Sequence, residues 1–217
     1  MELTQNPSVL ELVRKTAELT TPKEIVWIDG SEAQLESLRK IAVETGELIK
    51  LNEEKLPGCY LNRSDVNDVA RVEGRTFICS RTREEAGPTN NWMDPDEMKA
   101  KLHEILRCAM AGRTMYVIPY SMGVIGSPFA KYGIEVTDSI YVVLNMAIMT
   151  RIGTKVLDAL GDSSDVILGV HSKVTLDPEN RYIVHFPEEN KIISVNSNYG
   201  GNVLQGHYAA SLIFRQV

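Results

Sequence analysis

The sequence has little of several features that would each assign it to a class of proteins. Its three cysteines (Cys59, Cys79 and Cys108) are scattered, odd in number and without a paired metal-ligand spacing. No apolar run approaches the roughly 20 residues of a membrane-spanning helix. The start, MELTQNPSVLELVRK, has no basic region followed by an apolar core. These absences exclude a disulfide framework and predict a cytoplasmic protein with no secretory signal and no membrane span.

Motifs for nucleotide binding and for common catalytic centres are also absent. The sequence contains no G-x-x-x-x-G-K-[ST] motif, no serine in a nucleophile elbow and no metal-ligand spacing among its four histidines. The formal net charge is −6, and the acidic residues are spread along the chain. This charge argues against a nucleic-acid binder, which needs a basic excess on one face. Small anions are not excluded, because a few arginines and backbone amides can hold a carboxylate.

The first half of the chain reads as alternating helices and strands. The apolar spacing predicts an amphipathic helix over residues 6–19, followed by a buried strand within 24–30. Ser31 is expected to cap a second helix, with Gln34 as its capping-box partner and Gly46 as its stop. Residues 47–51 and 76–80 then read as further strands. This order is typical of an α/β sheet domain.

The second half continues the alternation. Asp94 is a predicted N-cap, with Pro95 at the first helical position, of a helix ending at Gly112. Residues 114–123 form a strong apolar strand pattern that runs into a glycine-rich loop. Residues 138–153 are almost continuously apolar, which predicts a fully buried segment, and we interpret it as a helix. The runs at 182–187 and 191–197 flank a short polar stretch and predict a β-hairpin.

Four features could bind a ligand, and each has a structural alternative. Arg71 could hold a carboxylate in its planar fork or be a solvated edge residue. The run 80–92, with Arg81, Arg83, Asn90, Asn91 and Trp92, could be a polar loop anchored by its tryptophan. Gly123 and Gly126 could form an anion-binding nest or a tight turn. The last feature is the stretch SNYGGNVLQGHY at 197–208, where Gly200 and Gly201 would let a ligand approach the main chain.

Several long segments resemble one protein family. They are VARVEGRTFICSRTREEAGPTNNWMDPDEMKAKL, GRTMYVIPYSMGVIGSPFAKYGIEVTDSIYVV, MTRIGTKVLDALGD and YGGNVLQG. In this order they are similar to the N-terminal domain of GTP-dependent phosphoenolpyruvate carboxykinase, from about residue 65 to residue 206. The resemblance implies one α/β domain over residues 1–217, built on a mixed sheet with flanking helices, with its last ten or so residues divergent.

The resemblance also implies a reaction and a site. The family converts oxaloacetate and GTP to phosphoenolpyruvate, GDP and CO₂, a lyase step of gluconeogenesis, with Mn²⁺ and Mg²⁺. The family's substrate-carboxylate arginine falls on Arg71, and its substrate loop falls on Tyr199, Gly200 and Gly201, with Asn202 as a further candidate. The implied ligand is a small organic acid such as oxaloacetate or phosphoenolpyruvate.

One departure from the family concerns the metal. Where the family has a manganese-binding lysine, this chain has the segment with His207 and Tyr208, so we expect no metal ligand there and no Mn²⁺, Mg²⁺ or GTP bound by this chain alone. Three hypotheses follow. The chain is a truncated carboxykinase, a free-standing non-catalytic binder of a small dicarboxylate, or a vestigial interaction module. A protein partner is expected on the face that a missing domain would cover.

Overall fold

The structure, a computed structural model, describes residues 2–68, 72–199 and 203. Five α-helices occur in these ranges: α1 (Pro7–Thr20), α2 (Glu32–Glu44), α3 (Pro95–Leu106), α4 (Ile140–Met149) and α5 (Thr154–Leu160). The strands are β1 (Glu24–Trp27), β2 (Ile49–Lys50), β3 (Tyr60–Leu61), β4 (Thr76–Ile78), β5 (Asn91–Trp92), β6 (Thr114–Met122), β7 (Lys131–Thr137), β8 (Arg151–Ile152), β9 (Ile167–Ser172), β10 (Tyr182–Phe186) and β11 (Lys191–Val195). Three short 3₁₀ turns complete the chain: η1 (Glu73–Arg75), η2 (Pro178–Asn180) and η3 (Pro187–Glu189).

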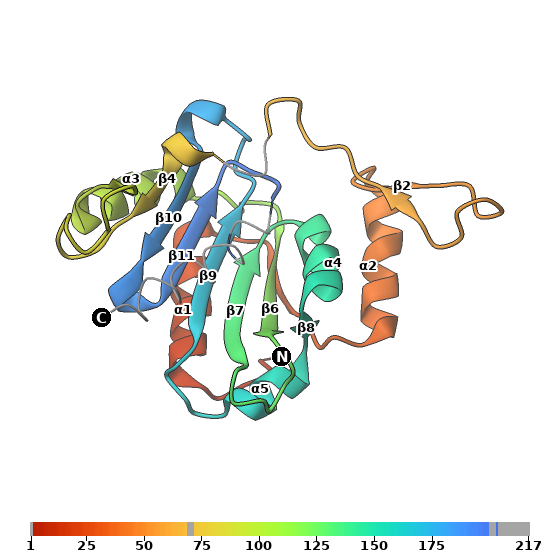
Figure 1. The fold of residues 1–217 in the computed structure, drawn as a ribbon. Helices are drawn as coiled ribbons and strands as arrows, with labels where there is room; N and C mark the ends of the chain where they lie inside the picture. The colour runs from red at the N-terminus through yellow and green to blue at the C-terminus, as the bar shows by residue number, and fades with distance from the viewer. Residues whose placement is uncertain (1, 69–71, 200–202, 204–217) are drawn as a thin grey trace.

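A nine-stranded mixed sheet organises the described residues, in the order β1-β6-β7-β9-β11-β10-β4-β5, with β8 paired to β6. Three neighbouring strands, β7, β9 and β11, run parallel to one another. Strands β6 and β10 run antiparallel to their neighbours β7 and β11. The carboxyl ends of β7, β9 and β11 therefore meet at one edge of the sheet, the upper edge in Figure 1. The predicted α/β fold with a mixed sheet and flanking helices is confirmed.

Helices cover the two faces of the sheet unequally. Helices α1, α3 and α5 pack on one face, where strand residues such as Val117, Ile134 and Val170 join them in one apolar core. Helices α2 and α4 cover only part of the other face, over β1 and β6, where Ile118 and Tyr120 point. Because strand side chains alternate between faces, each strand contributes to both layers. No helix in the described ranges is long and apolar enough to cross a bilayer.

Local signals placed the helix starts correctly. Asn6, Ser31 and Asp94 each accept hydrogen bonds at an N-cap, and Pro7 and Pro95 occupy the first helical positions. The predicted capping box at α2 is half right. The Ser31 hydroxyl accepts from the Gln34 N–H, but the Gln34 side chain bonds to the backbone of Trp27 and Asp29.

Two predictions about elements were wrong in part, and one predicted strand lies outside the main sheet. Helix α3 ends at Leu106, not Gly112, because the N–H groups of Cys108 and Met110 donate to the carbonyls of Leu19 and Thr20 at the end of α1. The predicted strand at 47–51 lies outside the main sheet, because β2 pairs only with β3. Figure 1 shows β2 beyond the outer side of α2. The apolar run at 138–153 contains the predicted helix, α4, but it ends in the short strand β8, and it is not fully buried, because Ile148 near the end of α4 is 84% exposed.

Two turns meet where no side chain could fit. Gly30, between β1 and α2, and Gly153, between β8 and α5, both have positive φ angles, 79° and 105°. A Cβ on Gly30 would lie 2.5 Å from the Ile152 carbonyl oxygen, and one on Gly153 would collide with the Asp29 carbonyl. The Thr154 N–H donates to the same Asp29 carbonyl at 3.1 Å. The two turns are therefore held together through backbone alone.

Candidate functional site

Asp68 lies shortly before the candidate ligand Arg71, and the pair Ser197–Asn198 lies just before the candidate loop at 199–202. These two segments are hydrogen-bonded to each other. The carboxylate of Asp68, three positions before Arg71, accepts from the Ser197 hydroxyl at 2.8 Å. Its other oxygen accepts from the Asn198 N–H at 2.7 Å. Asn198 precedes Tyr199 at the carboxyl end of β11. We call this contact between Asp68 and the pair Ser197–Asn198 the Asp68 junction.

Arg181, immediately before β10, contacts both sides of the Asp68 junction. Its guanidinium donates to the carbonyl of Asn67 at 2.6 Å and to the carbonyl of Asn196 at 2.8 Å. One guanidinium nitrogen lies 3.8 Å from the Asp68 carboxylate. Both side chains are almost completely buried, at 3% and 1% exposure. Removing one partner of such a buried pair leaves the other charge uncompensated, so the junction is rigidly specified.

A second set of hydrogen bonds ties Asn198 to the neighbouring strands. Ser139, the N-cap of α4 after β7, has its hydroxyl 2.9 Å from the Asn198 amide oxygen and 3.0 Å from Glu47. Lys173, which follows β9, lies 3.5 Å from the same Glu47 carboxylate. Residues from the carboxyl ends of β7, β9 and β11 are thus connected at one edge. In open α/β sheets this edge is where ligands bind.

His171 and Asp138 form the layer beneath this edge. His171 is completely buried, with its ring nitrogens 2.7 Å from the Thr137 hydroxyl and 2.7 Å from the Ser197 carbonyl. Burial lowers the pKa of His171, and the Asp138 carboxylate opposes that shift. Asp138 is itself held by Arg113 at 2.6 Å. A neutral His171 fits these two fixed partners, so its role is to support the Ser197 backbone.

Only part of the predicted site lies in the described residues. Tyr199 is 38% exposed, and its N–H donates to the Ser197 hydroxyl at 3.0 Å. The other predicted residues lie outside the described ranges: Arg71, Gly200, Gly201, Asn202, His207 and Tyr208. Sequence reasoning missed Asp68 and Arg181. Asp68 offered one usable signal, since it is an acid beside the candidate Arg71, whereas Arg181 lies in a polar turn without any motif.

The candidate loop at 80–92 uses its polar side chains for its own structure. The amide of Asn90 donates to the Ala86 carbonyl, and that of Asn91 donates to the carbonyls of Glu73 and Thr76. The Trp92 indole N–H donates to the Ser80 carbonyl at 3.0 Å. These contacts agree with the interpretation of a polar loop anchored by its tryptophan. The backbone N–H of Arg81 donates to the Glu188 carboxylate at 2.8 Å, which ties the loop to η3.

The glycines after β6 fit a tight turn. Gly123 and Gly126 have φ angles of 99° and 83°, which favour glycine. The Gly126 N–H, one of the donors that an anion nest would need, donates instead to the Tyr132 hydroxyl at 2.9 Å. The Ser121 hydroxyl donates to the Gly123 carbonyl at 3.2 Å. The turn is therefore closed by internal hydrogen bonds.

The side chains that could bind a metal ion are dispersed in the described part of the chain. Within residues 2–68, 72–199 and 203, no three His, Cys, Asp or Glu side chains lie close enough together to hold an ion. The carboxylates nearest the candidate edge are committed to other groups: Asp68 to Ser197 and Asn198, and Asp138 to Arg113. The described residues therefore offer no such group of ligands, and we derive no step through a metal.

Comparison with known proteins gives a consistent result. The profile of the family described as phosphoenolpyruvate carboxykinase N-terminal domain matches residues 11–215. The protein named phosphoenolpyruvate carboxykinase [GTP] from Anaeromyxobacter dehalogenans is 52% identical over 209 residues, which cover 96% of this chain and 35% of the relative. The proteins of the same name from Neocallimastix frontalis and Corynebacterium jeikeium are 50% and 47% identical, each covering 93% of this chain and 35% of the relative.

Two facts follow from these matches. The chain spans 35% of the length of the relatives named here, so the match does not assign their complete activity to this chain. The profile, in contrast, covers nearly all of this sequence, and the mixed α/β sheet agrees with it. The chain therefore belongs to the phosphoenolpyruvate carboxykinase N-terminal domain family.

Proposed function

We propose that this chain is the substrate-holding part of a GTP-dependent phosphoenolpyruvate carboxykinase, and that it binds a small dicarboxylic acid such as oxaloacetate. The ligand would lie at the sheet edge where β7, β9 and β11 end. The observation that carries the proposal is the Asp68 junction, because it joins the segments that precede the two candidate stretches, at Arg71 and at 199–202.

Chain connectivity supports this placement. Arg71 is three positions after Asp68, and Gly200 is two positions after Asn198. Because an extended chain advances at most about 3.6 Å per residue, both stretches start within a short reach of one point. A guanidinium from one stretch and backbone N–H groups from the other are complementary to a carboxylate. The half-exposed Tyr199 would offer a ring edge to the same ligand.

The chemistry of decarboxylation and phosphoryl transfer needs groups other than those described. In the proposed carboxykinase, Mn²⁺, Mg²⁺ and GTP would supply electrostatic stabilisation of the enolate and of the transferred phosphoryl group. The share of this chain is to bind the acid, orient it and fix the position of its carboxylates. Orientation of this kind lowers the barrier because less freedom is lost when the reaction begins.

Calorimetric titration of the purified chain with oxalate tests the proposal. Oxalate is expected to bind, and Arg71→Ala is expected to weaken binding at least about tenfold, because a charged bidentate contact is lost. Arg83→Ala, which removes an exposed arginine of the loop at 80–92, is the matched control and should leave affinity unchanged. No heat at millimolar oxalate, or equal affinity in Arg71→Ala, would contradict the proposal.

A second variant tests the Asp68 junction itself. Ser197→Ala removes the hydroxyl that donates to Asp68 and accepts from the Tyr199 N–H. We expect oxalate affinity to fall by roughly fivefold, since one hydrogen bond contributes about 1 kcal/mol. The matched control is Ser37→Ala on the exposed side of α2, where the hydroxyl bonds only within its own helix. Unchanged oxalate affinity in Ser197→Ala would show that the junction does not position the ligand.

A further inference from the structure

A groove lies between α1 and α3 on the helix-covered face of the sheet, away from the candidate site. Its volume is about 600 Å³, within the range of small-molecule sites. Leu19, Leu102 and Leu106 line it from the two helices, and Val170 and Ile193 form its floor from β9 and β11. The groove therefore has an aliphatic interior that opens to solvent along the gap between the helices.

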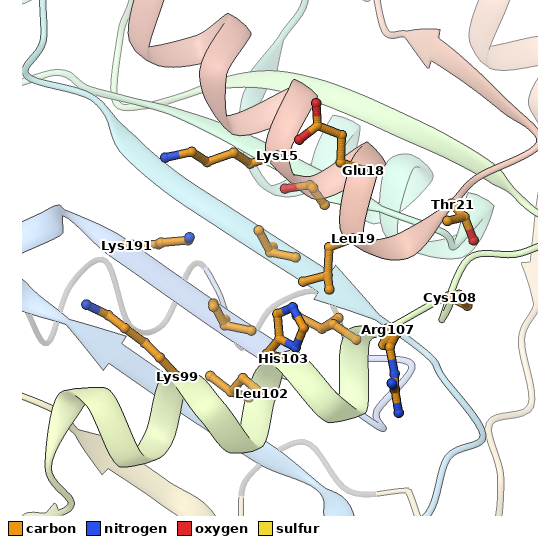
Figure 2. A pocket seen from close by; sticks show the side chains of 14 residues that line it. Lys15, Glu18, Leu19, Thr21, Lys99, Leu102, His103, Arg107, Cys108 and Lys191 are labelled. Atoms are coloured by element: carbon orange, nitrogen blue, oxygen red, sulfur yellow. The ribbon is translucent and has the colours of Figure 1, made fainter.

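Cations gather at one end of this groove. Figure 2 shows Lys15 from α1, Lys99 from α3 and Lys191 from β11 at one end, with Arg107 and Cys108 at the other. The lining contains one carboxylate, that of Glu18, and it is bonded to Arg14 at 2.6 Å. The lining thus has more cations than carboxylates, although the chain as a whole carries −6.

The three lysines differ in how their charges are balanced. Lys15 is paired with Glu11 at 3.0 Å and Lys99 with Glu189 at 2.5 Å. Lys191 lies between them and is half-buried, and its ammonium has no hydrogen bond or ion pair to another described residue. Burial lowers the pKa of Lys191, and Lys15 and Lys99 act in the same direction against Glu189. An anion at this end of the groove would give the Lys191 ammonium the partner that it lacks.

We propose that this groove binds a small amphipathic anion, a carboxylate or phosphate monoester joined to an aliphatic chain. The headgroup would lie among Lys15, Lys99 and Lys191, and the chain would lie on the leucines of α1 and α3. Lys191 is the first residue of β11, whereas the Asp68 junction follows its last residue, so the two sites lie at opposite edges of the sheet. The ligand would contact both α1 and α3.

Titration of the 217-residue chain with octanoate, octyl phosphate and 1-octanol tests the match of charge and chain. At least one of the two anions is expected to bind, and 1-octanol is expected to bind at least about tenfold more weakly, as loss of one charged contact implies. A preference between the anions identifies the headgroup. Equal affinity for 1-octanol would overturn the proposal. Absence of binding of either anion at millimolar concentration would also overturn it, even if an acidic amphipathic peptide were to bind.

Two variants separate the headgroup from the chain. Lys191→Gln keeps the aliphatic stem and removes the charge, and is expected to weaken binding of the anion about tenfold. Lys155→Gln, on the exposed side of α5, is the matched control and should not change it. Leu19→Trp should block the part of the groove that would hold the aliphatic tail of the ligand, while leaving all three lysines in place. If both Lys191→Gln and Leu19→Trp bind the anion as the unaltered chain does, the groove is not its site.

Discussion

Ile134 and Glu135 are adjacent in β7 and are both completely buried, yet they lie in two different environments. Ile134 faces the apolar core formed with α1 and α3. Glu135 points to the opposite face, where its register partners are Ile118 on β6 and Gly169 on β9. No described residue bonds to either Glu135 oxygen. One face of the sheet is thus filled by hydrocarbon and the other contains buried polar groups.

The polar face extends across the middle of the sheet. His171 and Ser194 face each other across β9 and β11, and His185 lies beyond them on β10. All three are buried, and among described residues neither the Ser194 hydroxyl nor the His185 Nδ1 has a partner. Val203 covers part of this face, where it packs against Gly169.

The difference shows two ways in which a sheet can be specified. Hydrocarbon burial on the α1/α3 face supplies the larger stabilisation, roughly in proportion to the area removed from water. Polar groups on the other face oppose folding unless they stay neutral, but they fix the register. A slip of β7 by one residue would exchange Ile134 and Glu135 between the faces and bring a carboxyl group into the apolar core.

The largest expected effect comes from the apolar side of this comparison. Ile134→Ala should lower the free energy of unfolding by about 3 kcal/mol, because it removes buried methyl groups and leaves a cavity. Urea denaturation followed by circular dichroism measures it. Ile148→Ala on α4, 84% exposed, is the matched control and should change stability by less than about 0.5 kcal/mol. A loss in Ile134→Ala no larger than in the control would mean that this face is loosely packed.

The polar face should respond to acid. Burial lowers the pKa of His185 to about 4, so between that value and its unfolded pKa near 6.5 the unfolded chain binds the additional proton. Stability should therefore fall by about 2 kcal/mol between pH 7 and pH 5. In His185→Phe the fall should be smaller by about this amount, as measured by urea unfolding at both values, and the fall that remains comes from other buried groups such as His171, whose pKa burial also lowers. His103→Gln, at an exposed position on α3, should retain the pH dependence of the unaltered chain.

A smaller effect of opposite sign is expected from Glu135. Burial raises the pKa of Glu135 well above that of an exposed glutamate. The folded chain then holds a proton that the unfolded chain has lost, so stability declines as the pH rises above the unfolded value. Glu135→Gln should be more stable than the unaltered chain at pH 8, and this gain should shrink toward pH 5. Glu44→Gln, at an exposed site, should show no such trend; a constant difference across this range in Glu135→Gln would place an ionised carboxylate in the fold.

Local rules account for much of the fold but not for its long-range pairings. N-caps such as Asp94 and the β10–β11 hairpin depend on neighbours in sequence, so they were predictable. The end of α3 depends on carbonyls of Leu19 and Thr20, nearly ninety positions away, as Cys108 and Met110 pair with them. No local pattern carries that information. Strand β7 was also missed, although Tyr132, Ile134 and Val136 alternate with Gly133 and Glu135 as the residues of a strand do.

The candidate site divides in the same way. A motif identified Tyr199, which is half-exposed beside the Asp68 junction. Sequence gave no indication of Arg181, because its role arises only when the start of β10 lies between Asn67 and Asn196. Predictions that concern Arg71, Gly200, Gly201 and Asn202 stay predictions, as do those for bound metal and GTP. Groups that touch a ligand recur as motifs, whereas groups that position them follow from topology.

The meeting of Gly30 and Gly153 has a consequence for how this sequence can vary. Each glycine needs its positive φ, and each occupies the space next to the backbone of the other turn. A clash between two side chains can often be relieved by shrinking one of them, but here neither residue has anything left to remove. No second change at either position can compensate for a side chain at the other. The pair therefore cannot change by successive compensating substitutions, as most pairs of packed residues can.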